Sequence, residues 1–225
     1  IATVAVCASL QVSTSLAQTA TDAEMAEDAL DPIVGSRIDA GLKSARIQDL
    51  HSRARERARV APQELASATV VFNTGQSIRE IGILAETLGL EITGLNVKAP
   101  LNDQGVIRSL LIGSDDLLRP RGSFETRAEH AIGLYRYEFL QWAEQLPPDE
   151  KEDVKKMAVS PMRIYGCEAV GTAQALSSLT QRSEITVVAF DSVEQAEERI
   201  SSYTQLKKQY AEAWARLDLE QGQRN

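Results

Sequence analysis

Residues 68–97 read ATVVFNTGQSIREIGILAETLGLEITGLNV, and this segment contains two predicted strands joined by one predicted helix. The first strand, Ala68–Phe72, is short and rich in β-branched residues, a composition typical of strands. The second strand covers Leu90–Val97. The segment therefore predicts a β-α-β unit.

The helix of this unit has a clear beginning and a clear end. Ser77 is the expected N-cap, and Glu80 completes the S-x-x-E capping box. Gly89 is expected to end the helix, because glycine tolerates the left-handed conformation found there. The predicted apolar stripe consists of Ile78, Ile81, Leu84, Ala85 and Leu88. Such a stripe predicts a helix that packs one face on a sheet.

The same arrangement recurs near the C-terminal end. Met162–Val170 and Ile185–Phe190 read as strands, and Thr172 is the expected N-cap of a short helix over Ala173–Leu179. Two β-α-β units in one small domain predict an α+β fold, a ferredoxin-like split β-α-β sandwich with a helical insert and additional N- and C-terminal helices. The first and third main strands should lie at the centre of the sheet, with the helices on one face.

The two units are separated by the predicted helical insert. After a turn at Asn102–Gly105, Val106–Ile112 can return as an antiparallel strand. Gly113–Gly122 reads as irregular, and Ser123 then begins a helix that ends at Pro147-Pro148, before a charged helical continuation. The apolar stripe of this helix has regular spacing, which predicts a core face. It consists of Ala128, Ile132, Tyr135, Phe139, Trp142 and Leu146.

Three features of the second unit point to a known family. They are a strand with a glycine, a helix with an Ala-Leu pair and a further Leu, and a β-branched closing strand: Ile164-Tyr165-Gly166, Ala175-Leu176, Leu179 and Ile185–Phe190. In these features the unit resembles the peptidase-inhibitor I9 (subtilisin propeptide-like) domain, and Val70–Leu90 resembles it more loosely. The resemblance implies a ferredoxin-like fold that inhibits a protease through its open sheet face and a C-terminal tail. In this chain a long charged helix follows the closing strand, so inhibition is not predicted.

The first residues predict export. Ile1–Val12 is apolar and uncharged, but it is shorter than the roughly 20 residues that span a bilayer. Ser15 and Ala17 place small residues at −3 and −1 of a cleavage site. Residues 1–17 are therefore predicted to be a signal peptide whose start is missing from this sequence, since the chain opens on Ile and lacks a basic n-region. The mature protein is expected to be periplasmic or secreted, to begin at Gln18 and to contain no transmembrane segment.

Two alternatives remain for this first segment. Cys7 could be lipidated, although the bulky Val6 precedes it. The apolar run could also be a buried strand or helix, although the acidic tract that follows at once is typical of the region after a signal peptide.

The next two segments differ in charge. Residues 18–36 contain five acidic and no basic residues before the arginine that follows them, and they are predicted to be a disordered leader. Residues 37–66 are predicted to contain a helix whose face includes Ile38, Leu42, Ala45 and Leu50. The basic end of this helix, His51–Arg59, is either a solvated helix end or a docking patch for an acidic partner or for the chain's own leader.

The α+β domain is assigned to residues 67–191 and the C-terminal helix and tail to residues 192–225. Asp191-Ser192 begins the helix, with Gln195 at the capping-box position. Its large apolar side chains form a seam of Ala196, Ile200, Tyr203, Leu206, Tyr210, Trp214 and Leu217. Because aromatic residues fit poorly at two-stranded coiled-coil positions, the helix should fold back onto its own domain or onto the N-terminal helix, leaving a monomer. The alternative is a structural adaptor that self-associates through this helix.

The chemistry-bearing residues give no enzyme signature. The net charge of −8 argues against nucleic-acid binding. If residues 1–17 are removed, Cys167 is the only cysteine of the mature chain. Its neighbour Glu168 would raise the pKa of the thiol, so a catalytic Cys–His pair with His51 or His130 is not predicted. The spacing of these residues matches no recognised metal site, and no cofactor is expected. A hydrolase or transferase with an unrecognised carboxylate pair stays open as an alternative.

The remaining candidate is the sheet face away from the helices. Strand alternation assigns Met162, Ile164 and Gly166 to the core and the intervening residues to the outer face. The outer face is expected to include Thr93, Leu95, Val97, Arg163, Tyr165 and Cys167. An apolar face of this kind is covered either by the chain's own terminal helices or by a partner. The sequence therefore predicts an exported, non-enzymatic binding module with a protein partner at this open face.

Overall fold

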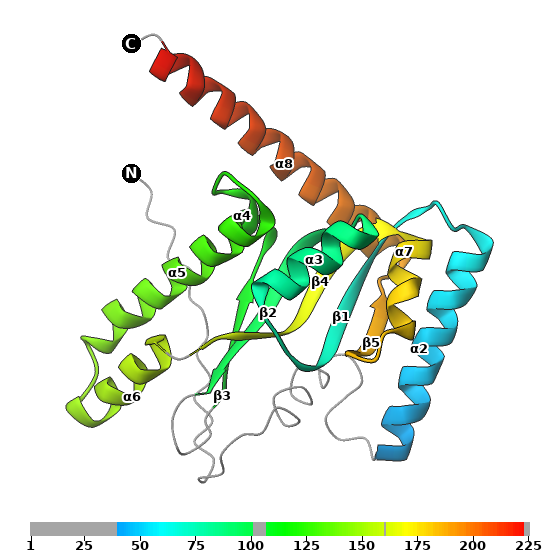
Figure 1. Cartoon of the computed structure of the whole chain (residues 1–225), viewed down its shortest axis with the longest axis horizontal. Coiled ribbons are helices and arrows are strands. Elements are labelled where there is room, and N and C mark those ends of the chain that lie inside the picture. Colours follow the sequence, from blue (N-terminus) through cyan, green and yellow to red (C-terminus); the bar gives the residue numbers. More distant parts are fainter. Residues whose placement is uncertain (1–39, 101–106, 160, 223–225) are drawn as a thin grey trace.

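The computed structural model (Figure 1) describes residues 40–100, 107–159 and 161–222. The predicted signal peptide (1–17), the acidic leader (18–36) and the turn at Asn102–Gly105 lie outside the described residues. The elements are, in chain order, α2 (Ala40–Val60), β1 (Leu65–Gln76), α3 (Ile78–Leu88), β2 (Glu91–Pro100), β3 (Ile107–Ile112), α4 (Ser114–Leu118), α5 (Phe124–Ala143), α6 (Pro148–Val159), β4 (Arg163–Thr172), α7 (Ala173–Ser178), the 3-10 helix η1 (Leu179–Gln181), β5 (Ile185–Phe190) and α8 (Val193–Gly222).

The strands form one antiparallel sheet in the order β3-β2-β4-β1-β5. Within it, β5-β1-β4-β2 is the strand order of a ferredoxin-like split β-α-β sandwich. The central positions of β1 and β4 confirm the predicted α+β class and the predicted place of the first and third main strands. The predicted return of the chain after β2 is also confirmed, because β3 pairs with β2 and extends the sheet by one edge strand.

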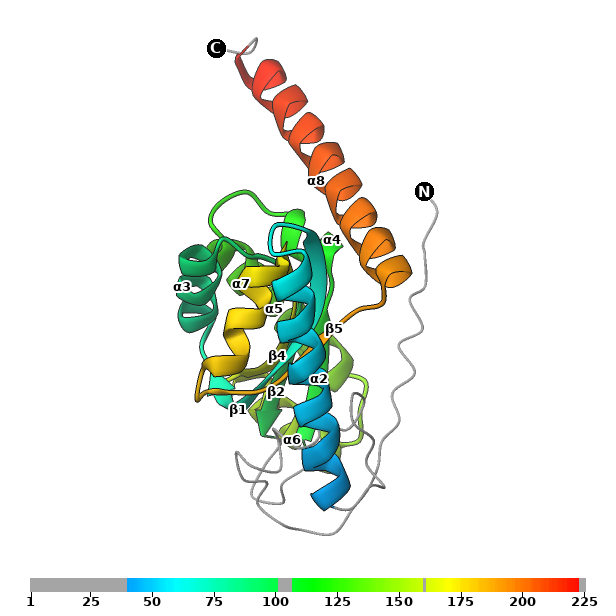
Figure 2. The same cartoon turned by 90° about the vertical axis from the view of Figure 1, so that its right-hand side faces the viewer.

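The main core lies between one face of the sheet and the helices α3, α5 and α7. Alternate residues of β1 point into it, and so do the apolar stripe of α3 and the first half of α5. The buried members from these elements are Ala66, Ala68, Val70, Phe72, Ile81, Leu84, Ala85, Ala128, Ala131, Ile132, Ala173 and Leu176. Figure 2 shows α3 on one side of the sheet and α8 on the other. We call the side of α8 the outer face.

The local helix signals are confirmed in detail. Ser77 accepts a hydrogen bond from the Glu80 N–H, and the Glu80 carboxylate accepts one from the Ser77 N–H. Gly89 has φ 63°, ψ 37°, the left-handed conformation that favours glycine. Thr172 caps α7, and a reciprocal pair of hydrogen bonds between Ser192 and Gln195 begins α8.

The N-terminal helix packs only in part on the predicted face: Leu50 is half-buried as expected, and Ile38 lies outside the described residues. Leu42 and Ala45 are exposed, whereas Ala54 is fully buried and His51 is partly buried. The reason is that α2 contacts β5 and α7, and this contact is made by its C-terminal half. Apolar spacing alone did not identify Ala54 and His51 as the residues that pack against the edge of the sheet.

The apolar stripe of α5 is confirmed as a core face, but it divides between two clusters. Ala128 and Ile132 belong to the main core. Phe139, Trp142 and Leu146 pack instead around Ala143 in a smaller cluster. This division arises because α5 is longer than the sheet that it covers, and its second half pairs with α6 beyond the β2–β3 side of the sheet (Figure 1).

The stretch Gly113–Gly122, expected to be irregular, contains one short helix. In α4, Leu117 and Leu118 are buried, and the helix contacts α5, α8 and β2. Its five residues are too few for the periodic apolar pattern by which a helix is recognised in a sequence.

Candidate functional site

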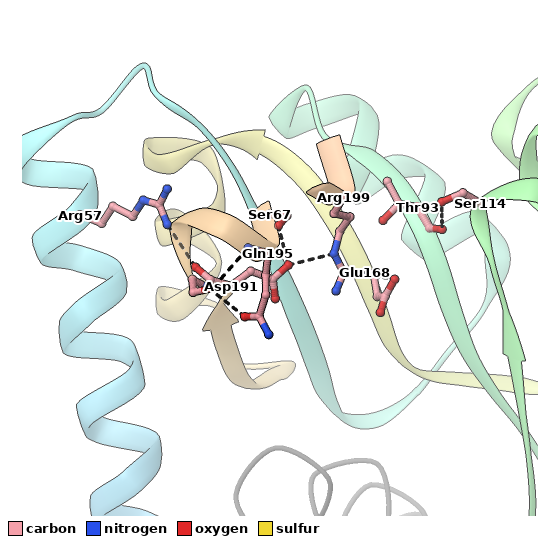
Figure 3. A network of polar contacts seen from close by, with 9 residues as sticks. Arg57, Ser67, Thr93, Ser114, Glu168, Asp191, Gln195 and Arg199 are labelled. Carbon is pink, nitrogen blue, oxygen red and sulfur yellow. Dashed lines mark hydrogen bonds and ion pairs between the residues drawn. The ribbon is translucent and has the colours of Figure 1, made fainter. Parts of the chain in front are cut away.

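The beginning of α8 is joined to the outer face of the sheet by a polar cluster, which we call the α8 junction and define as Ser67, Glu168, Asp191 and Arg199 (Figure 3). The Ser67 Oγ donates a hydrogen bond to Asp191 Oδ2 at 2.5 Å. Arg199 Nε donates to the same carboxylate oxygen at 2.9 Å, and Arg199 Nη1 forms an ion pair with Glu168. The cluster thus connects β1, β4 and α8.

The position of Asp191 follows from its backbone. Its N–H donates to the Ser67 carbonyl oxygen at 3.0 Å, which extends the β1–β5 pairing by one residue. Its own carbonyl oxygen accepts from Arg57 Nη1 of α2 at 3.3 Å. The side chain of Asp191 is only 13% exposed and that of Arg199 is 25% exposed. The carboxylate is therefore held in a partly desolvated place where its charge requires a partner.

The charges of the junction compensate one another. Burial alone would lower the pKa of Arg199, but the bonds to Glu168 and Asp191 outweigh it and keep the pKa above its usual value. Ser67 donates to a carboxylate that is already bonded to a guanidinium. An activated serine needs a base that can take up its proton. The geometry of the junction supports the anchoring of a helix rather than nucleophilic catalysis.

The middle of α8 is held by a second set of polar contacts. Tyr203 Oη and Lys207 Nζ donate to the two carboxylate oxygens of Glu91, at 2.8 and 2.5 Å. Tyr210 Oη donates to Asp115 of α4 at 2.5 Å. Further along, Arg121 forms a two-pronged ion pair with Asp218 at 2.7 and 2.5 Å. These contacts confirm that the C-terminal helix folds back onto its own domain.

The carboxylates beneath α8 are poor general acids. Burial acts to raise the pKa of Glu91, but hydrogen bonds from Lys207 and Tyr203 outweigh it, and the pKa lies below its usual range. The hydrogen bond from Tyr210 lowers the pKa of Asp115, and Arg119 lowers it further. A general acid at neutral pH requires a raised pKa. Neither carboxylate therefore favours the hydrolase alternative.

Three of the six predicted partner-binding residues face the helices instead of the outer face. Leu95, Val97 and Cys167 belong to the main buried core, so their expected outward orientation is wrong. The cause is a pair of β-bulges. Thr93 is an extra residue between the paired positions of β2, and Tyr165 is an extra residue in β4. Each bulge reverses the alternation of the residues that follow it.

The other three predicted residues lie in different surroundings. Thr93 is buried, and its Oγ1 has no hydrogen-bond partner among the described residues, while its carbonyl oxygen accepts from Ser114 Oγ at 2.8 Å (Figure 3). Tyr165 is fully buried, with its ring against Gly75 and the Lys98 ammonium 5.8 Å from the ring centre. A side chain at Gly75 would overlap this ring. Arg163 is exposed.

The Cys167 thiol is buried, and the His51 imidazole accepts a backbone hydrogen bond. Burial, with a smaller contribution from Glu168, raises the pKa of the Cys167 thiol to about 12, as the sequence predicted for the effect of this neighbour. Thiolate chemistry is disfavoured at such a pKa. The His51 Nε2 accepts a hydrogen bond from the Val188 N–H at 3.2 Å. An imidazole with that bond is not available as a base.

Within the part of the chain that the structure describes, no group of three or more His, Cys, Asp or Glu side chains is arranged to hold a metal ion. In the same residues, no helix combines the length and apolar composition needed to cross a membrane. A shallow groove of about 320 Å³ lies beside α3. It is lined by Phe72, Gln76, Glu80, Ile81, Ile83, Leu84, Thr87, Arg182 and Glu184.

An exposed apolar stripe on α5 was missed by the sequence reasoning. Leu134, Tyr137 and Leu140 are 39%, 61% and 37% exposed, and they lie on the side opposite the core stripe of the same helix. We call these three residues the α5 stripe. The spacing of three residues between them is the sequence signal that could have identified this stripe. The longer apolar stripe on the opposite side of α5 made it hard to recognise.

The comparisons with known proteins give no relative: no family model, no curated protein and no solved structure matches this chain. The resemblance of the β-α-β units to the peptidase-inhibitor I9 domain therefore stays a hypothesis.

Proposed function

We propose that the protein is an exported, non-enzymatic binding module of the cell envelope or the secreted fraction, and that a protein partner docks on the α5 stripe. The observation that carries the proposal is the exposure of Leu134, Tyr137 and Leu140 along a helix whose opposite side is packed. Contiguous apolar patches of this kind are typical of interaction surfaces. The α5 stripe takes the place of the open sheet face as the proposed docking surface, because the apolar residues predicted for that face are buried.

The charge around the stripe defines the kind of partner. At 100° per residue, the stripe covers one side of α5, and Glu129 and Glu138 flank it on its two borders, each beside a half-buried arginine, Arg136 and Arg127 respectively. Both glutamates are exposed, and the whole chain has a net charge of −8. A complementary protein surface would have an apolar centre with a rim of lysine or arginine residues.

No comparable observation supports the hydrolase or transferase alternative or the self-associating adaptor. The carboxylates near α8 have lowered pKa values, the opposite of what a hydrolase needs in its general acid. The self-associating adaptor would use the seam of α8, but Tyr203 and Tyr210 of that seam bond to Glu91 and Asp115 of the same chain. The expected monomer is consistent with those contacts.

Site-specific cross-linking tests the proposed docking surface. A photo-reactive amino acid in place of Tyr137, in the chain expressed in its native cells, is expected to give one defined cross-linked protein with a basic surface. The double substitution Leu134→Ser and Leu140→Ser should reduce the yield of the cross-linked product at least about tenfold. The partner would bury both leucines, and losing both contacts costs more than about 1.4 kcal/mol of binding free energy.

The matched control is the same photo-reactive residue at Val60, an exposed apolar position on α2. It should not give the cross-link obtained at position 137. Equal cross-linking from both positions, or a yield unchanged by the double substitution, would contradict docking on the α5 stripe.

Export is tested separately. Mass spectrometry of the protein from the envelope or secreted fraction is expected to show an N-terminus at Gln18, because Ser15 and Ala17 occupy the −3 and −1 positions of the predicted cleavage site. Substituting Ala17→Glu should block cleavage and retain residues 1–17. Finding the protein in the cytoplasm with residues 1–17 still attached would reject export. That result would not bear on docking at the α5 stripe.

A further inference from the structure

The edge strand β5 has α2 along its outer side. One side of β5 pairs with β1. On the other side, the Val188 N–H donates to His51 Nε2 at 3.2 Å. Six residues further along α2, Arg57 donates to the Asp191 carbonyl oxygen at 3.3 Å, and its guanidinium lies 5.6 Å from the centre of the Phe190 ring.

These two contacts require the helix and the strand to run side by side. Six residues separate His51 from Arg57, about 9 Å along a helix. Three residues separate Val188 from Asp191, about 10 Å along a strand. The two distances match, so α2 runs parallel to β5. Ala54, fully buried between the two contacts, lets the helix approach closely because its side chain is a single methyl group.

The contact of His51 depends on its protonation state. A neutral imidazole has one nitrogen that accepts, whereas both nitrogens of the protonated form are donors. Protonation at Nε2 would oppose two donors across the 3.2 Å contact with Val188. The charged form is also disfavoured by the surroundings, because burial and then Arg55 lower the pKa of His51.

Other charges near this contact do not reverse that preference. The segments β5 and α7, against which α2 packs, contain no titratable side chain. The next charged side chains along the contact are Arg57, Glu64 and Asp191, and Arg57 bonds to Glu64 at 2.9 Å. Asp191 directs its carboxylate to Ser67 and Arg199.

We propose that α2 is a pH-sensitive cover of the β5 edge, whose closed position is favoured while His51 is neutral and whose equilibrium shifts toward opening when the imidazole becomes protonated. Alternation along the paired part of β5 places the N–H and C=O groups of Val188 and Phe190 on the side of α2. Opening uncovers this row of backbone groups, which is the feature that makes an edge strand available for pairing with another chain.

The direction of the pH effect follows from linkage. The closed state has the lower His51 pKa, so it binds a proton less readily than the open state, in which the pKa returns to about its reference value of 6.5. The contribution of His51 to the closed state is therefore fully present above pH 6.5 and is lost progressively as the pH falls below it. At pH 5.0 the opening equilibrium can increase by up to about 30-fold, the limit for an imidazole that does not protonate in the closed state.

Amide hydrogen exchange measured by NMR on the full chain tests the proposal. The Val188 protection factor, which corrects for the intrinsic pH dependence of exchange, is expected to fall several-fold to about 30-fold between pH 7.5 and 5.0. His51→Gln retains an acceptor that does not titrate, and its protection factor should stay constant. His130→Gln, which changes an exposed histidine on α5, should behave like the unaltered chain.

Two results would overturn the proposal. One is a Val188 protection factor with the same pH dependence in the unaltered chain and in His51→Gln. The other is an NMR titration of the imidazole carbon signals that gives His51 a pKa at or above 6.5 in the folded protein. The titration uses the unaltered chain, so it decides the question even where a substitution impairs folding.

Discussion

Replacing Phe72 with alanine is expected to lower the free energy of unfolding by about 3–5 kcal/mol. Phe72 is among the largest fully buried side chains and belongs to the main core, which it enters from β1. The substitution removes the burial of an aromatic ring and leaves a cavity, and both effects destabilise the folded state. Urea denaturation monitored by circular dichroism measures the change.

Phe139→Ala is the matched comparison, since it removes the same group from α5. Phe139 is only partly buried and lies in the smaller cluster around Ala143, so its loss should cost about 1–2 kcal/mol. The apolar spacing alone would have assigned the larger cost to this residue. A larger effect for Phe139 than for Phe72 would show that the α5–α6 pair, and not the sheet, forms the main core.

Replacing Arg199 with methionine is expected to cost about 2–4 kcal/mol. Methionine retains most of the side-chain volume but leaves Asp191, whose side chain is 13% exposed, without its guanidinium partner. Removing one member of a buried ion pair is costly because the remaining charge is desolvated and unpaired. The contact between α8 and β4 through Glu168 is lost at the same time.

Arg216→Met on the same helix is the control. Arg216 is exposed, and its partner Glu212 is one turn away at 4.0 Å. Exposed pairs of this type contribute little, so the substitution should change the free energy of unfolding by less than about 0.5 kcal/mol. Similar costs for the two arginine variants in urea denaturation would show that the α8 junction does not hold the helix.

The fold class and most elements were predictable because their signals are local. The capping box of Ser77 and Glu80, the left-handed Gly89 and the cap at Thr172 each depend on residues within a few positions of one another. The two β-α-β units then limited the possible topologies, and the observed order of β5, β1, β4 and β2 is the one predicted.

The candidate site was less predictable. The outward orientation expected for Leu95 and Cys167 failed because the bulges at Thr93 and Tyr165 leave no mark on a pattern of period two. The polar anchors of α8 were invisible for a different reason. Ser67 and Asp191 are 124 residues apart, and Tyr203 and Glu91 are 112 apart, so only folding brings each pair together.

The sequence alone thus determined the α+β class, the central strands, the helix caps and the core side of α5, because these follow from periodicity and from short-range hydrogen bonding. Only the tertiary structure decided the side of each strand after a bulge, the burial of Ala54 and His51 against β5, and the polar docking of α8. Those outcomes depend on register and on contacts between distant elements, for which a single sequence contains no local signal.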